Sequence, residues 1–182
     1  MNIRSKSGVK YTAIFLIAVF VAFYLAYLCG MRINRTHSLP KGIYWMVNKT
    51  PERGDIVAFW PQDNQALRLG RERGYIIPGV YNKADGIGYG LLLKRYLGLP
   101  GDIVSITDIG ITINGVAIPN TKPLNADNMG DPLPRIHLDN YQLREHEALF
   151  VSDHLPRSFD ARYFGVQETR QIVDVVVPVW TW

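Results

Sequence analysis

The feature that most constrains this 182-residue chain is a run of 21 uncharged residues from Tyr11 to Met31. A helix of that length rises about 31 Å, which matches the hydrocarbon core of a bilayer. The run is longer than the apolar core of a cleaved signal peptide, which spans about 7–15 residues. We therefore expect residues 11–31 to form an uncleaved transmembrane anchor.

The charges on either side of this run bear on its orientation. Basic residues nearly balance across it, with Arg4, Lys6 and Lys10 before the run and Arg32, Arg35 and Lys41 after it. Long domains cross membranes largely regardless of such counts, and a ten-residue tail is easily retained. The expected topology places residues 1–10 in the cytoplasm and residues 32–182 on the outer face as one domain.

Charge and motif content exclude several function classes. All 16 acidic residues and 17 of the 20 basic ones follow residue 31, so the outer part carries a net charge of only +1. That balance argues against nucleic acid as a partner, since nucleic-acid binding needs a dense basic face. We expect no cofactor, because phosphate-binding and dinucleotide-binding motifs are absent. We expect no metal either, because the spacing of His137, His146 and His154 matches no zinc motif.

Beyond the anchor the pattern predicts an all-β domain. Short β-rich runs are separated by turn residues every eight to twelve positions or so. The expected strands are 55–60, 103–106, 111–113, 116–118, 147–151 and 172–177, the last ending at Pro178. Asn114-Gly115 is the dipeptide that best supplies two positive φ angles in a hairpin turn. Helix is expected only over 65–72 and 142–146, and residues 70–90 are expected to run over the surface.

One lysine lies in an apolar setting. Lys94 is surrounded by Leu91, Leu92, Leu93, Tyr96 and Leu97. At its ordinary pKa of about 10.4, only about one lysine in 2,500 is neutral at pH 7. Burial that lowers the pKa to about 8 would make about a tenth of the molecules neutral, at a cost of about 3 kcal/mol. Lys94 is therefore a candidate general base, or otherwise an edge-strand lysine whose stem covers leucines.

A serine lies close to the expected membrane surface. Seven residues separate Met31 from Ser38, so the serine hydroxyl lies within about 25 Å of the bilayer even in an extended chain. A nucleophile at that height can reach peptide bonds just outside another protein's membrane segment. Thr36 stands two residues earlier, where its hydroxyl could join the Ser38 backbone N–H in an oxyanion hole. A turn leaving the membrane would also explain Pro40 and Gly42.

Four segments resemble, in order and rough spacing, the serine-lysine signal peptidase family (peptidase S26). They are residues 38–44, 54–59, 94–102 and 151–165. Within the family they are most similar to the conjugative-transfer branch, the TraF-type pilin maturation peptidases. In that branch the proline stands two residues after the serine, as Pro40 follows Ser38. The resemblance implies a signal-peptidase-like β domain behind one transmembrane helix.

The resemblance also implies roles for individual residues. Ser38 matches the nucleophile, Lys94 the general base, Thr36 the oxyanion-hole hydroxyl, Ser158 a hydroxyl that orients the lysine, and Asp160 with Arg162 a charged pair. In the conjugative branch, the counterpart of Asp160 is implicated more directly in activity. Two departures stand out: the last segment contains Ser152-Asp153-His154 in place of Gly-Asp-Asn, and residues 62–90 align with nothing in the family.

The resulting expectation is a serine endopeptidase of the bacterial inner membrane with its domain in the periplasm. Its expected partners are the bilayer and a propilin or similar precursor, cleaved by hydrolysis or closed into a ring. The alternatives are a general type I signal peptidase and a non-catalytic periplasmic pilus assembly factor. A histidine base is disfavoured, since no Gly-x-Ser-x-Gly elbow occurs and His37 points away from Ser38 in an extended chain.

The placement of five aromatic residues is left open by the sequence. They can rest on lipid headgroups or pack in the core, and they are Trp45, Phe59, Trp60, Trp180 and Trp182.

Overall fold

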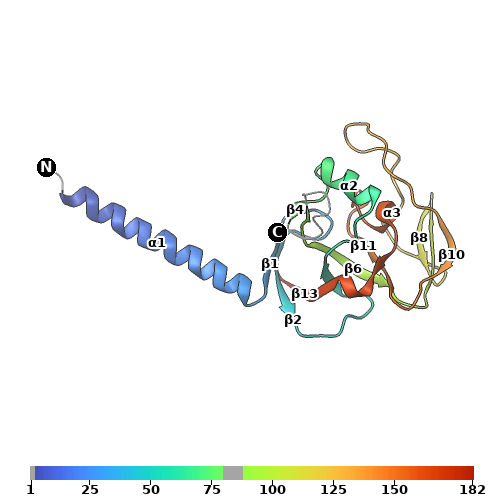
Figure 1. Cartoon of the computed structure of the whole chain (residues 1–182), viewed down its shortest axis with the longest axis horizontal. Helices are drawn as coiled ribbons and strands as arrows, with labels where there is room; N and C mark the ends of the chain where they lie inside the picture. Colours follow the sequence, from blue (N-terminus) through green and yellow to red (C-terminus); the bar gives the residue numbers. More distant parts are fainter. Residues whose placement is uncertain (1–2, 80–87) are drawn as a thin grey trace.

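The computed structural model describes residues 3–79 and 88–182. Helix α1 (Ile3–Leu28) extends away from a β-rich domain, and the first strand begins close to the end of this helix (Figure 1). Its segment Gly8–Leu28 is apolar and long enough to cross a membrane, and none of it is buried against the domain. The helix ends three residues before the expected end of the anchor. Gly30 turns the chain at a φ of +109°, and Met31 already belongs to a strand.

The main sheet is antiparallel and has seven strands. In spatial order they are β1 (Met31–Asn34), β2 (Gly42–Val47), β13 (Ile172–Thr181), β3 (Ile56–Phe59), β6 (Leu92–Gly98), β11 (Glu147–Val151) and β12 (Gln167–Glu168). The strand that bears Lys94 is therefore an inner strand of the sheet, between β3 and β11. Lys94 pairs with Val57 across the β3–β6 ladder.

A second antiparallel sheet has four strands, and a third has two. The four are β10 (Leu138–Gln142), β7 (Ile103–Thr107), β8 (Gly110–Ile113) and β9 (Val116–Ala117), and the two are β4 (Pro78–Gly79) and β5 (Gly88–Tyr89). The hairpin predicted at Asn114-Gly115 is confirmed, with φ angles of +51° and +79°. The all-β expectation is confirmed as well.

The helices of the domain are short. They are α2 (Gln65–Glu72), α3 (Ala161–Phe164) and a 3-10 turn, η1 (Thr169–Gln171). The predicted helix over 65–72 is confirmed, and Asn64 caps it by accepting the Leu67 N–H at 2.9 Å. Residues 80–87 of the expected surface excursion lie outside the described residues.

Two secondary-structure predictions in the C-terminal part of the chain were wrong. Residues 142–146 form no helix, because Gln142 still pairs with β7 and the backbone of Leu143 bonds both Gly101 and Asp102 at 2.8 Å. The last strand does not end at Pro178 but continues to Thr181 beside β2. An irregularity in the pairing between Pro178 and Trp180 accommodates the residue that lacks an N–H.

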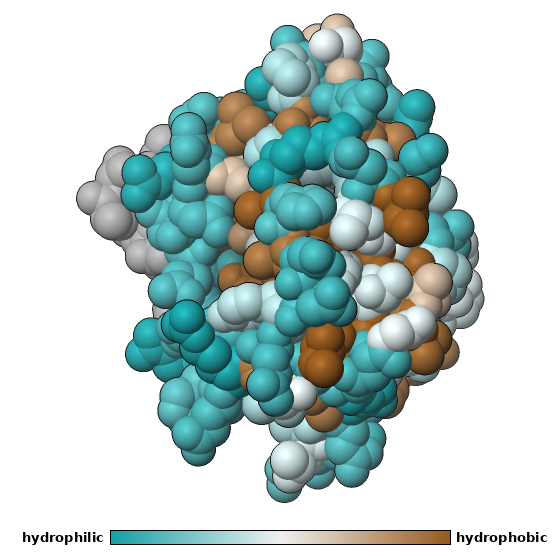
Figure 2. Space-filling view, turned by 90° about the vertical axis from the view of Figure 1, so that its right-hand side faces the viewer, coloured by the Kyte–Doolittle hydropathy of each residue, from teal (hydrophilic) through white to brown (hydrophobic). Residues whose placement is uncertain are grey.

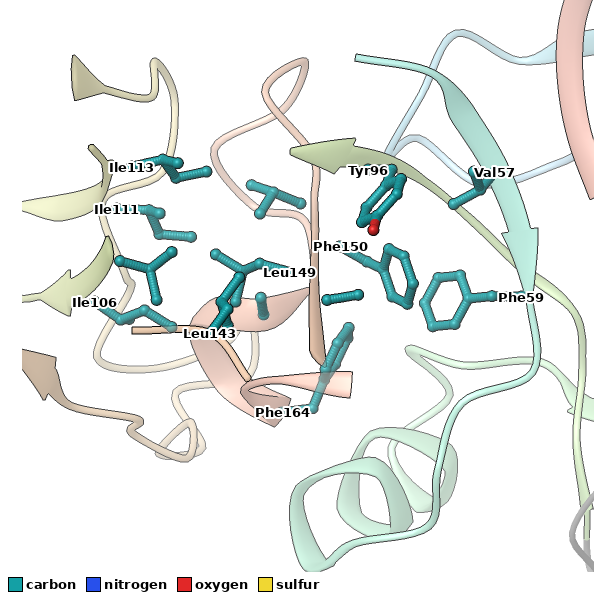
Figure 3. Close-up of a cluster of buried hydrophobic side chains, with 14 of the residues drawn as sticks. Val57, Phe59, Tyr96, Ile106, Ile111, Ile113, Leu143, Leu149, Phe150 and Phe164 are labelled. Carbon is teal, nitrogen blue, oxygen red and sulfur yellow. The ribbon is translucent and has the colours of Figure 1, made fainter. Parts of the chain in front are cut away.

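One hydrophobic core joins the two larger sheets (Figure 3). Phe59 of β3 and Phe150 of β11 face each other with ring centroids 4.2 Å apart, while Ile106 and Ile111 come from the second sheet. Phe59 is thus a core residue. Trp45, Trp180 and Trp182 are exposed, and Trp60 is half-buried.

Candidate active site

Ser38 lies in the turn between β1 and β2, and the side chain of Asn34 organises this turn. The buried Asn34 amide nitrogen donates to the carbonyl oxygens of Thr36, Leu39 and Pro40 at 3.0–3.1 Å. Its oxygen accepts from the backbone N–H of Thr36 at 3.1 Å and from the Thr36 hydroxyl at 2.9 Å. Five hydrogen bonds from one side chain fix the turn that presents the serine.

These bonds determine which way the hydroxyl protons point. Three carbonyls around the Asn34 nitrogen fix the orientation of its amide, so its oxygen can only accept the Thr36 proton. Ser38 Oγ lies 3.0 Å from Thr36 Oγ1. Because Thr36 has one proton, Ser38 is the donor in this contact. To stabilise an oxyanion, Thr36 would have to turn its proton away from Asn34.

Lys94 on β6 is buried, with 4% of its surface exposed. Its amine donates to Ser158 Oγ at 3.1 Å. Desolvation lowers the pKa of Lys94 from 10.5 to about 8, while Asp160 raises it and Arg162 lowers it more weakly. About a tenth of the molecules therefore carry a neutral amine at pH 7, as the apolar sequence around Lys94 predicts.

Behind the lysine, Asp160 and Arg162 form a fully buried ion pair. The two side chains meet in two bonds of 2.8 Å, and neither is exposed to solvent. Arg162 also donates to the backbone oxygens of Ser158 at 2.9 Å and of Asn120 at 3.0 Å. A buried pair is tolerated when its remaining polar atoms are bonded in this way. The pair holds the backbone of Ser158, whose hydroxyl meets the lysine.

Ser152 connects this pair to Ser38. Its N–H donates to Asp160 Oδ2 at 2.9 Å, and its hydroxyl donates to the carbonyl oxygen of Ser38. Asp153, which follows, pairs instead with Arg95 at 2.9 Å. The sequence drew attention to Asp153 and missed both Ser152 and Asn34. Only the preference of asparagine for bonding turn backbone could have singled out Asn34.

A cleft of about 680 Å³ brings the candidate residues together. Thr36, Ser38, Lys94 and Ser158 line it, whereas Asp160 does not line it and bonds Ser152 and Arg162. Within the described residues the lysine amine bonds Ser158 rather than Ser38. His37 lines the cleft, and the other three histidines do not.

In the described ranges 3–79 and 88–182, no three His, Cys, Asp or Glu side chains are grouped so as to hold a metal ion. The arrangement offers a hydroxyl, a partly neutral buried amine and hydroxyl neighbours in one cleft. Such a set is suited to acyl transfer.

Comparisons with known proteins place the chain among signal peptidases. Residues 5–182 match the family model described as signal peptidase, peptidase S26. A plasmid transfer protein TraF of Escherichia coli is 42% identical over 98% of this chain and 99% of its own length. A second Escherichia coli protein of that name is 40% identical over 86% of this chain and 85% of its own. A signal peptidase I structure from Enterococcus faecalis V583 is 23% identical, with a TM-score of 0.40, over 71% of this chain and 98% of that one.

Proposed function

The chain belongs to the signal peptidase family, peptidase S26, and on that basis we propose that it is a membrane-anchored serine endopeptidase of conjugative transfer with a Ser38/Lys94 dyad. The observation that carries this proposal is the buried Lys94 amine, with a pKa of about 8, in the cleft that Ser38 also lines. A lysine kept charged in water could not serve as a base at neutral pH.

In the proposed mechanism the neutral Lys94 amine removes the Ser38 proton as the serine oxygen attacks a substrate carbonyl. Ser38 must first give up its bond to Thr36, and Thr36 must turn its proton away from Asn34, before both hydroxyls are free for the reaction. The Thr36 hydroxyl and the Ser38 N–H then stabilise the oxyanion. Lys94 returns the proton to the leaving amine, and water releases the acyl-enzyme. Ser158 keeps the lysine side chain oriented toward the cleft.

The proposed substrate is a propilin or a similar membrane-associated precursor. Two relatives that each match at least 85% of their own length are named plasmid transfer proteins. The helix ends ten residues before Ser38, so the nucleophile stands close to the membrane surface. An amine of the pilin itself in place of water would give a cyclic product, and both outcomes use the same acyl-enzyme.

We further propose that the β1–β2–β13 edge of the domain rests on the bilayer. The exposed residues there are Trp45, Val179, Trp180 and Trp182. The backbone N–H of Trp182 donates to the backbone oxygen of Lys41, which lies close in sequence to Ser38. Tryptophan is enriched at membrane interfaces. The face opposite the helix is mostly hydrophilic (Figure 2). The proposed location is the bacterial inner membrane, with the domain on the periplasmic side. Protease digestion of the domain in spheroplasts, but not in intact cells, would support it.

The test is precursor processing by the full-length protein in membranes. Ser38→Ala should abolish cleavage of a propilin, while Ser105→Ala, on β7 and outside the cleft, should cleave normally. Continued cleavage by Ser38→Ala would refute the dyad. A non-catalytic assembly factor predicts that even the wild type leaves the precursor intact. A general signal peptidase predicts equal cleavage of the propilin and an unrelated secretory precursor.

A further inference from the structure

Part of the cleft that Ser38 lines is formed by a loop, residues 124–133, hereafter the wall loop. It contributes Leu124, Asp127, Asn128, Met129, Asp131 and Leu133 to the lining. We propose that the wall loop determines which precursor the enzyme accepts, by contacting apolar side chains next to the cleaved bond. This inference rests on the proposed peptidase function and names the surface that determines its substrate specificity.

The wall loop is closed on itself by Asp127. One oxygen of this carboxylate accepts the N–H groups of Met129 at 2.8 Å and Asp131 at 3.0 Å. The backbone of Asp127 also bonds the Asp131 oxygen at 2.9 Å, and Leu133 bonds Asn125 at 2.9 Å. A loop with so many internal bonds presents its side chains in one arrangement. It is therefore suited to discriminate between substrates.

A turn at residues 73–75, hereafter the latch, holds the wall loop in place through hydrogen bonds. The Tyr75 hydroxyl donates to the second oxygen of Asp127, and Arg73 donates to the Pro132 oxygen at 2.9 Å. The Tyr75 ring packs against Phe159, with centroids 5.3 Å apart. Tyr75 and Arg73 come from the region 62–90, for which the sequence segments gave no counterpart although the family model spans it. The structure thus gives part of that region a role, which is to support the wall of the cleft.

The latch is connected to the catalytic residues. Phe159 follows Ser158, whose hydroxyl bonds Lys94. Phe159 also stacks on Tyr163 at 5.3 Å, and the Tyr163 hydroxyl accepts the Leu124 N–H at 3.0 Å. Leu124 and Asp127 of the wall loop are therefore connected, through Tyr163 and through Tyr75 with Phe159, to the segment that contains Ser158. A substrate held by the wall is held at a fixed position relative to the nucleophile.

The chemistry of the wall favours an apolar segment of the precursor. Leu124, Met129 and Leu133 of the wall loop line the cleft, and so does Leu155 from outside the loop. Met129 is 88% exposed. Apolar side chains that are grouped in a cleft are typical of a binding site, whereas a single exposed one is not. The residues just outside a membrane segment of a precursor are a chemically matched occupant.

The experiment compares two charged substitutions of exposed apolar residues. Met129→Glu changes the wall, and Ile109→Glu changes an equally open side chain, 84% exposed, in the β7–β8 turn. With full-length protein in vesicles, Met129→Glu should raise the KM for a propilin by about tenfold, equivalent to about 1.4 kcal/mol. The kcat should stay unchanged, and Ile109→Glu should change neither constant.

A second pair tests the latch. Tyr75→Phe removes the hydroxyl that bonds Asp127 but keeps the ring. Tyr141→Phe removes a hydroxyl that bonds Glu147, and neither Tyr141 nor Glu147 lines the cleft. Only Tyr75→Phe should lower the ratio of kcat/KM for the propilin to that for a secretory precursor. Unchanged KM values and ratios in active enzyme would overturn this inference alone. A wild type that cleaves neither precursor would overturn the peptidase proposal and this inference with it.

Discussion

Replacing Lys94 with methionine should remove activity and yet make the protein more stable at neutral pH. Lowering the lysine pKa from 10.5 to about 8 costs about 3 kcal/mol of folding free energy, since each pKa unit corresponds to about 1.4 kcal/mol. Methionine fills a similar volume without that cost. The bond from Lys94 to Ser158 is lost, which removes about 1 kcal/mol of stabilisation. The net gain at pH 7 is therefore about 2 kcal/mol.

The gain should depend on pH in a defined direction. The native pKa of Lys94 lies below that of the unfolded chain, so between pH 8 and 10.5 the unfolded state binds more protons. Wild-type stability consequently rises with pH across that window, and the full cost is present only below pH 8. The advantage of Lys94→Met should be largest at pH 7 and vanish by about pH 10.5.

The assay is thermal unfolding of the full-length protein in detergent. For a chain of this size, 2 kcal/mol corresponds to a melting temperature about 4–8 °C higher at pH 7. Lys122→Met, at an exposed position, is the matched control and should stay within about 0.5 kcal/mol of wild type. Equal melting temperatures of Lys94→Met and wild type at pH 7 would refute the desolvation argument. So would a difference that stays constant up to pH 10.5.

Three further predictions concern the same site. The kcat/KM for precursor cleavage should rise about tenfold per pH unit below pH 8 and level off above it, because only the neutral amine is a base; a flat profile between pH 6 and 8 would contradict this. Asn34→Ala should lower kcat and change KM less. In a double-mutant cycle the loss of kcat from Asn34→Ala should not add to the loss from Thr36→Val, because both substitutions remove the same hydrogen bond of the Thr36 hydroxyl. Ser152→Ala should also lower kcat with a smaller effect on KM, whereas a change in KM alone would mean that Ser152 does not position Ser38.

The sequence predicted the elements whose residues carry local signals. The hairpin at Asn114-Gly115 follows from the turn preference of that dipeptide. The helix expected over 65–72 is present, and in the structure Asn64 caps its first turn. The strand that continues beyond Pro178 could not be predicted in this way. Its continuation depends on pairing with β2, which lies more than 130 residues earlier in the chain.

The residues of the candidate site also differ in whether their local sequence identified them. Lys94 stood out because its own neighbours are apolar, and the structure gives its pKa the direction that this setting predicts. Asn34 and Ser152 gave no comparable signal. Both residues contact the turn that contains Ser38, and the Ser152–Ser38 contact spans 114 positions of sequence.

The low pKa of Lys94 depends on how the two neighbouring charges are combined. Asp160 alone would favour the charged amine, and Arg162 alone would oppose it. The two charges have opposite signs and lie together in one buried pair with bonds of 2.8 Å, so their effects on the amine partly cancel. Desolvation is then the largest influence on the amine. The pair can thus hold Ser158 and Ser152 in place without keeping the proposed base protonated.

Breaking the Asp160–Arg162 pair with Asp160→Asn should weaken folding and leave the arginine charge beside Lys94 uncompensated. Any folded Asp160→Asn enzyme should have a pH–rate profile shifted to lower pH, and an unshifted profile in active protein would show that the pair has no electrostatic effect on the amine.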